Sequence, residues 1–198
     1  VQKVWEVLGR KSETEDDSIS VNPEYILTNK KHVQFLDIIG GEPFYHKKAK
    51  NLLRELIRTR DSEHITVHIT TNATRIDLDT ISLLKQFEDV ILSISIDGVG
   101  KLQEYIRPGS DWNTLTKNIK LLRQHKISLQ TVSTIGVLNI LGLQELEDWC
   151  QTNGIHWGQP GLIERPLELQ PHNLPYQLHK FVPEKYKINF IIFFYCYK

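Results

Sequence analysis

The chain has 198 residues, 40% of them hydrophobic and 24% charged, which suits one soluble domain with a hydrophobic core. Its 24 basic residues balance 24 acidic ones, and it has no apolar run of the roughly 18 residues that span a membrane. This composition therefore excludes a dedicated binder of nucleic acid or membranes. Two cysteines are too few for a disulfide framework, so we predict a reducing compartment, the cytoplasm.

Residues 1–32 are predicted to form the end of a helix and an acidic loop. Four apolar residues within 1–10 share one face at the spacing i, i+3, i+4 and i+7, which is typical of an amphipathic helix. Residues 11–22 are polar and acidic and precede Pro23, so they are expected to form a surface loop.

From residue 33 onward, strand-like and helix-like segments alternate. Strands are predicted at 33–39, 64–70, 89–96 and 127–135, with a last strand beginning near Ile155, and helices at 46–60, 77–87, 111–125 and 141–153. Gly154 lies where a glycine commonly ends a helix. Alternation with short loops predicts right-handed βαβ units and a parallel sheet in the core, 33–165.

Residues 166–198 are expected to begin a C-terminal region. Its last part, 188–198, is strongly apolar and aromatic, unlike the sequence before it. We interpret this tail as a truncation or reading-frame artefact, and exposure of such a segment would favour aggregation.

The tetrapeptide Gly40-Gly41-Glu42-Pro43 closes the first predicted strand. Glycine allows the backbone to approach a ligand and to adopt positive φ, and Pro43 restricts Glu42 to extended conformations. These residues predict a rigid shelf of backbone groups that binds a small zwitterion such as an amino-acid head group. The alternative is a strand-end turn whose carboxylate caps the next helix.

Two further polar groups end the next two predicted strands. Thr70, Thr71 and Asn72 either face a ligand or cap the following helix, as such residues often do. Ser95 and Asp97 alternate with isoleucines and so share one face of a strand, where polar side chains are costly unless they bind something. Asp97 alternatively organises the turn at the following glycine.

Arg107 lies in a Pro-Gly loop, and its planar fork is suited to a bidentate contact with a carboxylate, although an ordinary surface arginine is the alternative. Ser133, on the fourth predicted strand, is a weaker candidate. His64 and His68 lie four residues apart on a strand and so lack the spacing of metal ligands, which predicts core or surface histidines.

The motifs GGEP, TTNAT, SISIDG and EYIRPGSDW occur in this order at the ends of predicted strands. As a set they resemble the radical S-adenosylmethionine (SAM) enzymes, and the stretch from Ser95 through Trp112 to Ile119 resembles the twitch-domain subgroup. The resemblance covers roughly residues 33–187. It implies an α/β fold, a partial parallel (βα)6 TIM-type barrel represented by units two to six, with ligands at the C-terminal ends of the strands.

The resemblance also implies a cofactor site. It places the GGEP motif on the amino group of SAM, the TTN residues beside the cofactor, Ser95 on its ribose, and Arg107 on a carboxylate of cofactor or substrate. The predicted cofactor-binding residues are Gly40, Gly41, Glu42, Pro43, Thr70, Thr71, Asn72, Ser95, Asp97, Arg107 and Ser133. In this family a reduced [4Fe-4S] cluster cleaves SAM to a 5′-deoxyadenosyl radical that abstracts hydrogen from substrate. The family implies a peptide as a candidate substrate.

One family feature is missing from this sequence. The family holds its cluster with a Cys-x-x-x-Cys-x-x-Cys loop before GGEP, whereas the two cysteines here, Cys150 and Cys196, lie far downstream. We therefore expect a fragment of a longer enzyme, with an exposed and aggregation-prone edge at its first strand, that is inactive by itself and offers no metal ligand and no certain catalytic residue. The twitch-domain resemblance also implies a second region after residue 160 that can carry an auxiliary cluster, but a single cysteine there, Cys196, does not supply a ligand set for one.

Two other functions remain open from the sequence. One is a non-catalytic α/β module that binds SAM without a cluster. The other is an unrelated barrel enzyme in which Glu42 and Asp97 perform acid–base chemistry.

Overall fold

The computed structural model describes residues 23–187, so the predicted helix of 1–10, the loop of 11–22 and the apolar tail of 188–198 lie outside the described residues. The described chain forms two compact units. Unit 1 comprises residues 23–95 and 113–130, and unit 2 comprises residues 96–112 and 131–187.

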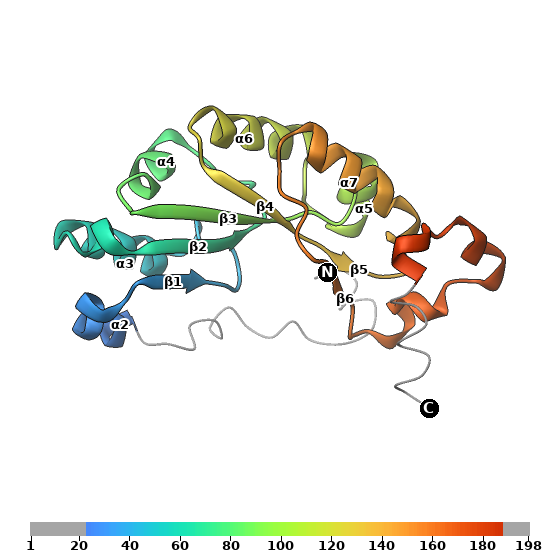
Figure 1. Cartoon of the computed structure of the whole chain (residues 1–198), viewed down its shortest axis with the longest axis horizontal. Coiled ribbons are helices and arrows are strands. Elements are labelled where there is room, and N and C mark those ends of the chain that lie inside the picture. The colour runs from blue at the N-terminus through green and yellow to red at the C-terminus, as the bar shows by residue number, and fades with distance from the viewer. Residues whose placement is uncertain (1–22, 188–198) are drawn as a thin grey trace. The chain divides into compact units, whose positions relative to one another are not determined.

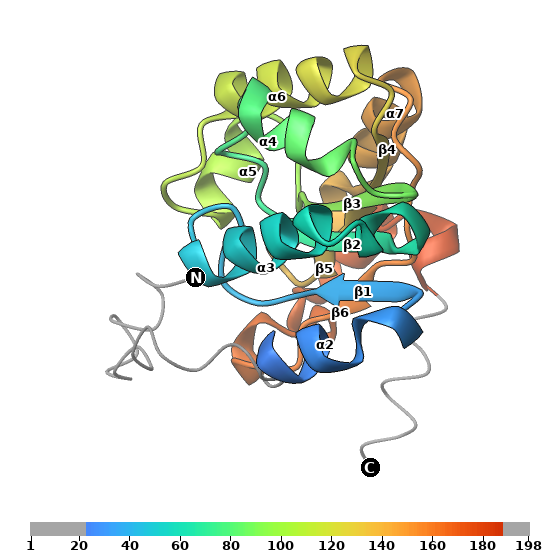
Figure 2. The same ribbon diagram turned by 90° about the vertical axis from the view of Figure 1, so that its left-hand side faces the viewer.

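Unit 1 contains most of a four-stranded sheet. Its strands β1 (Phe35–Ile38), β2 (Thr66–Thr71), β3 (Asp89–Ser95) and β4 (Ser128–Val132) are hydrogen-bonded in the order β1-β2-β3-β4. The β1–β2 and β2–β3 pairs are parallel, and Phe35 pairs with Thr66, which pairs with Asp89. Figures 1 and 2 both show α4 (Leu78–Leu84) above β3 and α2 (Pro23–Asn29) below β1, and Figure 2 shows α3 (Lys47–Arg58) in front of β2.

Local sequence explains these elements. Helix α3 buries Leu52, Leu53 and Leu56 on one face, as its 3.6-residue periodicity predicts. Helix α4 begins at Asp77, whose carboxylate accepts a hydrogen bond from the Thr80 N–H at 2.7 Å. Helix α6 (Trp112–Gln124) follows the same pattern and buries Leu115, among others. The predicted α/β fold with a parallel sheet is therefore confirmed.

Unit 2 contains the shorter elements. They are α5 (Lys101–Ile106), β5 (Thr134–Ile135), α7 (Leu143–Thr152) and β6 (Gly161–Leu162), together with the 3-10 turns η3 (Ile140–Gly142), η4 (Leu167–Leu169), η5 (Pro171–Asn173) and η6 (Tyr176–Phe181). Strands β5 and β6 are parallel and form their own two-stranded sheet. A small core of Ile135, Ile140, Leu143, Leu174, Val182 and Tyr186 joins these segments.

Some predicted boundaries are wrong. The strand predicted over 127–135 is two strands, because β4 pairs within the four-stranded sheet whereas β5 pairs with β6 in a second sheet. Near Ile155 only His156 forms a bridge, and the last strand comes later, at β6. Strand β2 starts at Thr66, since Asp61–His64 forms the 3-10 turn η2.

Helices α2 and α5 were not predicted, because each is only six or seven residues long and too short for a clear period. Gly154 has the predicted positive φ, 63°, just after α7. Among the residues that the structure describes, no helix has the length and apolar character to cross a membrane.

Candidate functional site

In unit 1, the carboxylate of Glu42 joins the ends of β1 and β2. Its Oε1 accepts a hydrogen bond from the Thr71 hydroxyl at 2.6 Å, and its Oε2 accepts one from the Asn72 N–H at 2.7 Å. The Phe44 N–H lies 3.4 Å from Oε1. The carboxylate thus holds two loops together and caps no helix, since α3 begins at His46 without a side-chain cap.

The two glycines before Glu42 have the conformation that the sequence predicts. Gly40 has φ 102° and Gly41 has φ 54°, both in the region that side chains rarely adopt. A Cβ on Gly41 would lie 2.7 Å from His46 Nε2, so the exposed ring of His46 would have to move to admit it. Both glycines are exposed, whereas Pro43 is buried, so the exposed backbone is anchored directly behind them.

The loop after β2 is fixed from several sides. Thr71 is buried and also accepts a hydrogen bond from the Ala73 N–H at 3.0 Å, so Thr71 is the inward threonine of the pair. Asn72 Oδ1 accepts from the N–H and the hydroxyl of Thr74. Asn118 of α6 donates to the Ala73 carbonyl at 2.8 Å. The capping alternative for Thr70, Thr71 and Asn72 is wrong, because Asp77 caps α4.

Two other predicted residues of unit 1 lie at strand ends. Ser95 is the last residue of β3 and is half-buried. Thr70 is half-buried in β2, where it pairs with Ser93. Both therefore lie at the C-terminal end of the parallel sheet, the end at which ligands bind in folds of this kind.

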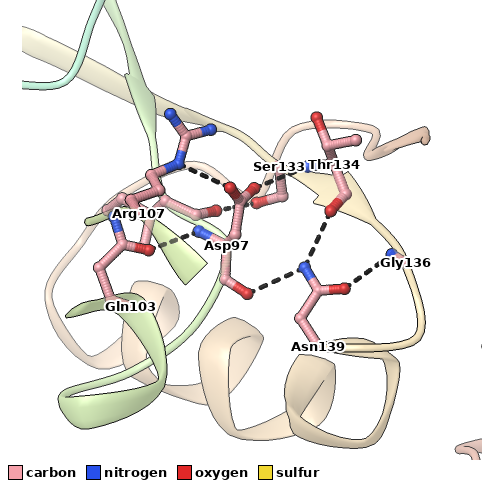
Figure 3. Close-up of polar contacts among 8 residues, drawn as sticks. Asp97, Gln103, Arg107, Ser133, Thr134, Gly136 and Asn139 are labelled. Carbon is pink, nitrogen blue, oxygen red and sulfur yellow. Dashed lines mark hydrogen bonds and ion pairs between the residues drawn. The ribbon is translucent and has the colours of Figure 1, made fainter. Parts of the chain in front are cut away.

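In unit 2, Asp97 is the centre of a buried polar network (Figure 3). Its Oδ1 accepts from the Thr134 N–H at 2.8 Å, and its Oδ2 accepts from Arg107 Nε at 2.6 Å. Its own N–H donates to Gln103 Oε1, and its carbonyl accepts from Asn139 Nδ2. The side chain of Asp97 is only 6% exposed, so this carboxylate organises the loops around it, more extensively than the predicted turn at Gly98.

Arg107 presents its terminal nitrogens away from Asp97, as Figure 3 shows. Its side chain is 28% exposed, and its Nε is committed to Asp97. A guanidinium fixed through Nε keeps its remaining donors in a defined direction. Ser133, by contrast, is buried, and its hydroxyl donates to the Ile96 carbonyl within the chain.

Several residues of these networks lay outside the predicted site. Asn118, Gln103 and Asn139 are buried amides that bond to backbone groups of the motif loops. Asn139 also donates to the Thr134 carbonyl and accepts from the Gly136 N–H, so all of its polar atoms are used. The only sequence signal for these three residues is an Asn or Gln at a position that the pattern of an amphipathic or loop segment predicts to be buried, because a buried amide needs hydrogen-bond partners.

The cysteines do not fit a [4Fe-4S] cluster, which is normally held by thiolates. Cys150 is the one cysteine among the described residues; it is buried in α7, and burial raises the pKa of its thiol to about 12. No group of three His, Cys, Asp or Glu side chains that suits a metal ion occurs between residues 23 and 187. The residues present therefore do not form a cluster site.

The buried thiol gives a direct prediction. Because the pKa of Cys150 lies near 12, we expect no alkylation of this residue by iodoacetamide at pH 8 in the native chain and full alkylation in urea. Mass spectrometry of the peptide that contains Cys150 measures this. Rapid native alkylation at Cys150 would contradict the buried placement of α7.

The family model described as the Radical SAM superfamily matches residues 13–152, more than half of the chain. The chain belongs to the radical SAM superfamily. Among curated proteins, no sequence matches it.

Solved radical SAM structures share the fold. SuiB from Streptococcus suis bound to S-adenosylmethionine has a TM-score of 0.62 at 20% identity, and the match covers 92% of this chain and 43% of SuiB. The native enzyme anSMEcpe with bound AdoMet has a TM-score of 0.62 at 16% identity, covering 81% of this chain and 48% of anSMEcpe. The methyltransferase TsrM from Kitasatospora setae, with cobalamin and a [4Fe-4S] cluster bound, has a TM-score of 0.52 at 14% identity, covering 71% and 31%. The chain thus spans less than half the length of these radical SAM proteins.

Proposed function

We propose that this chain binds SAM, as the SAM-binding part of a radical SAM enzyme. The observation that carries the proposal is the position of Glu42, which is held by Thr71 and Asn72 next to two exposed glycines of positive φ. Such an arrangement fixes backbone carbonyls and a carboxylate beside each other. The ammonium group of an amino acid needs this set of acceptors.

Each predicted residue has a role in this proposal. In unit 1, the carbonyls of Gly40 and Gly41 accept hydrogen bonds from the amino group of SAM, and Ser95 bonds to its ribose. In unit 2, Arg107 binds a carboxylate of cofactor or substrate through its terminal nitrogens, and Asp97 positions it. We propose Thr70 of β2 as a further cofactor contact within unit 1, and we give Ser133 a supporting part within unit 2, where its hydroxyl holds the Ile96 carbonyl next to Asp97.

The proposed activity of the whole protein is radical chemistry on a substrate. In radical SAM enzymes a [4Fe-4S] cluster supplies the electron that cleaves SAM. No residue set within 23–187 fits such a cluster, so we propose that this chain is inactive by itself. SuiB has been solved bound to the precursor peptide SuiA, which supports a peptide as the proposed substrate class. We also propose membership of the twitch-domain subgroup, on the run from Ser95 to Ile119.

A second candidate is a SAM-binding module without catalysis. The specific observation in its favour is the number and place of the cysteines: two in the sequence, neither of them before GGEP. A module of this kind would keep the Glu42 arrangement and need no electron source.

Calorimetric titration of the chain with SAM tests the proposal. We expect saturable binding, and we expect no 5′-deoxyadenosine after anaerobic treatment with iron, sulfide and dithionite, because the cluster lacks ligands. Absence of SAM binding would overturn both candidates. Formation of 5′-deoxyadenosine by this chain would instead contradict the proposed inactivity and the module.

A further inference from the structure

One face of the unit 1 sheet is only partly buried. Along β1, Leu36 is buried while Phe35 and Asp37 on either side of it are exposed. Along β2, buried Val67 precedes half-buried His68, which pairs with Asp37 across the ladder. Period-two alternation therefore places Phe35, Asp37 and His68 on the same accessible face.

An ordered chain of polar groups crosses this face. His68 Nδ1 lies 2.8 Å from Asp37 Oδ1, and its Nε2 lies 2.5 Å from Ser93 Oγ. Gln130 Nε2 donates to Ser93 Oγ at 2.7 Å. Both ring nitrogens of His68 therefore have a partner in unit 1, Asp37 on one side and Ser93 on the other, and this holds the imidazole in place.

The order Asp, His, Ser is also that of a nucleophilic triad, but burial argues against this chemistry here. Ser93 is 0% exposed, so a substrate does not reach its hydroxyl. The accessible end of this row of hydrogen-bonded side chains is Asp37, whose side chain is 39% exposed. Beside it the ring of Phe35 is 56% exposed and stacks on His68, with 6.3 Å between ring centroids and 29° between planes.

We propose that Phe35 and Asp37 form a binding subsite for the ammonium or guanidinium group of a basic side chain of the substrate. Among residues 23–187, His68 is the sole ion-pair partner of Asp37, and the side chain of Asp37 is still 39% exposed. A carboxylate next to an exposed aromatic ring suits a cation through a charge-assisted hydrogen bond and a cation–π contact. His68, Ser93 and Gln130 are positioning residues.

The identity of the ligand as a peptide side chain rests on the proposed function, but the binding itself requires no SAM. The probe is Nα-acetyl-L-arginine amide, titrated into the 15N-labelled chain and followed by NMR. We expect saturable shifts at the amides of Phe35, Asp37 and His68, and none with the uncharged citrulline analogue.

Variants separate the contributions of the Asp37 carboxylate and the Phe35 ring to probe binding. Asp37→Asn is expected to weaken probe binding about tenfold and Phe35→Leu about threefold, because each removes one of the two attractions. The matched control is Asp79→Asn, an exposed aspartate of α4, which should bind the probe like the parent chain. Thermal unfolding verifies that each variant is folded.

Positioning by His68 has its own test. His68→Asn keeps a side-chain N–H near Asp37 Oδ1 and should retain most probe binding, whereas His68→Ala should lose about as much as Asp37→Asn. A merely structural role would lower thermal stability equally in both variants without separating their affinities.

Three results would overturn the proposal. The first is unchanged probe binding by Asp37→Asn. The second is a parallel loss of SAM binding in Asp37→Asn, which would assign the carboxylate to the cofactor. The third is labelling of Ser93 by a fluorophosphonate, which would make Ser93 a nucleophile. Probe binding in a chain that does not bind SAM would leave the subsite standing and the proposed function refuted.

Discussion

Glu42→Gln is expected to weaken SAM binding at least about tenfold. The glutamine side chain keeps the size of Glu42 but loses the negative charge that strengthens the hydrogen bonds from Thr71 and Asn72. Hydrogen bonds to a charged group contribute about 1.5–3 kcal/mol, and 1.4 kcal/mol corresponds to a factor of ten in Kd. Calorimetric titration with SAM gives the Kd of parent and variant.

Glu88→Gln is the matched control, because Glu88 is an exposed glutamate of the same unit, just before β3. It makes the same chemical change away from the motif loops and should bind SAM like the parent chain. If Glu42→Gln lowers the free energy of unfolding and leaves the Kd for SAM unchanged, Glu42 only joins the two loops, and its proposed part in binding is wrong.

The strands of the sheet could be predicted well from the sequence, because each strand is indicated by residues within or next to it. Apolar runs followed by Gly, Thr or Asp identified β1, β2 and β3 to within two residues at every end, and the positive φ of Gly40 and Gly41 followed from residue type alone. Helix α3 was equally clear, since one periodic face spans its whole length. Elements shorter than two turns, such as α5, carry no comparable period.

The contacts between the motifs could not be predicted in the same way. Glu42 and Asn72 are 30 residues apart, and they meet because Ile38 pairs with Ile69 in a parallel register. The Asp37–His68 pair has the same origin, which is why the histidine spacing along one strand gave no indication of it. Register depends on the whole sheet, so cross-strand partners are fixed only when all strands are placed.

The alternative of acid–base chemistry by Glu42 and Asp97 gains no argument from the structure. Both carboxylates accept hydrogen bonds at both oxygens from the chain itself. A general base needs an oxygen directed at its substrate.

Asp97→Asn is expected to lower the free energy of unfolding by about 3 kcal/mol. Breaking a buried ion pair typically costs 3–5 kcal/mol, and the 28% exposure of Arg107 places this pair near the lower end. The new amide also directs an N–H at either the Thr134 N–H or Arg107 Nε, so one donor loses its acceptor. Urea unfolding followed by tryptophan fluorescence measures the change, since Trp112, Trp149 and Trp157 all belong to unit 2.

A double-mutant cycle separates the ion pair from the rest of the network. Arg107→Gln removes the other charge, and in the double variant we expect part of the loss to be recovered, with a coupling of about 1–2 kcal/mol, because no unpaired charge remains. Asp148→Asn, an exposed aspartate of α7, is the control and should change stability by less than about 0.5 kcal/mol. Additive effects of the two substitutions would mean that the Asp97 side chain stabilises unit 2 through the Thr134 N–H and that Arg107 is held by a group other than the Asp97 carboxylate.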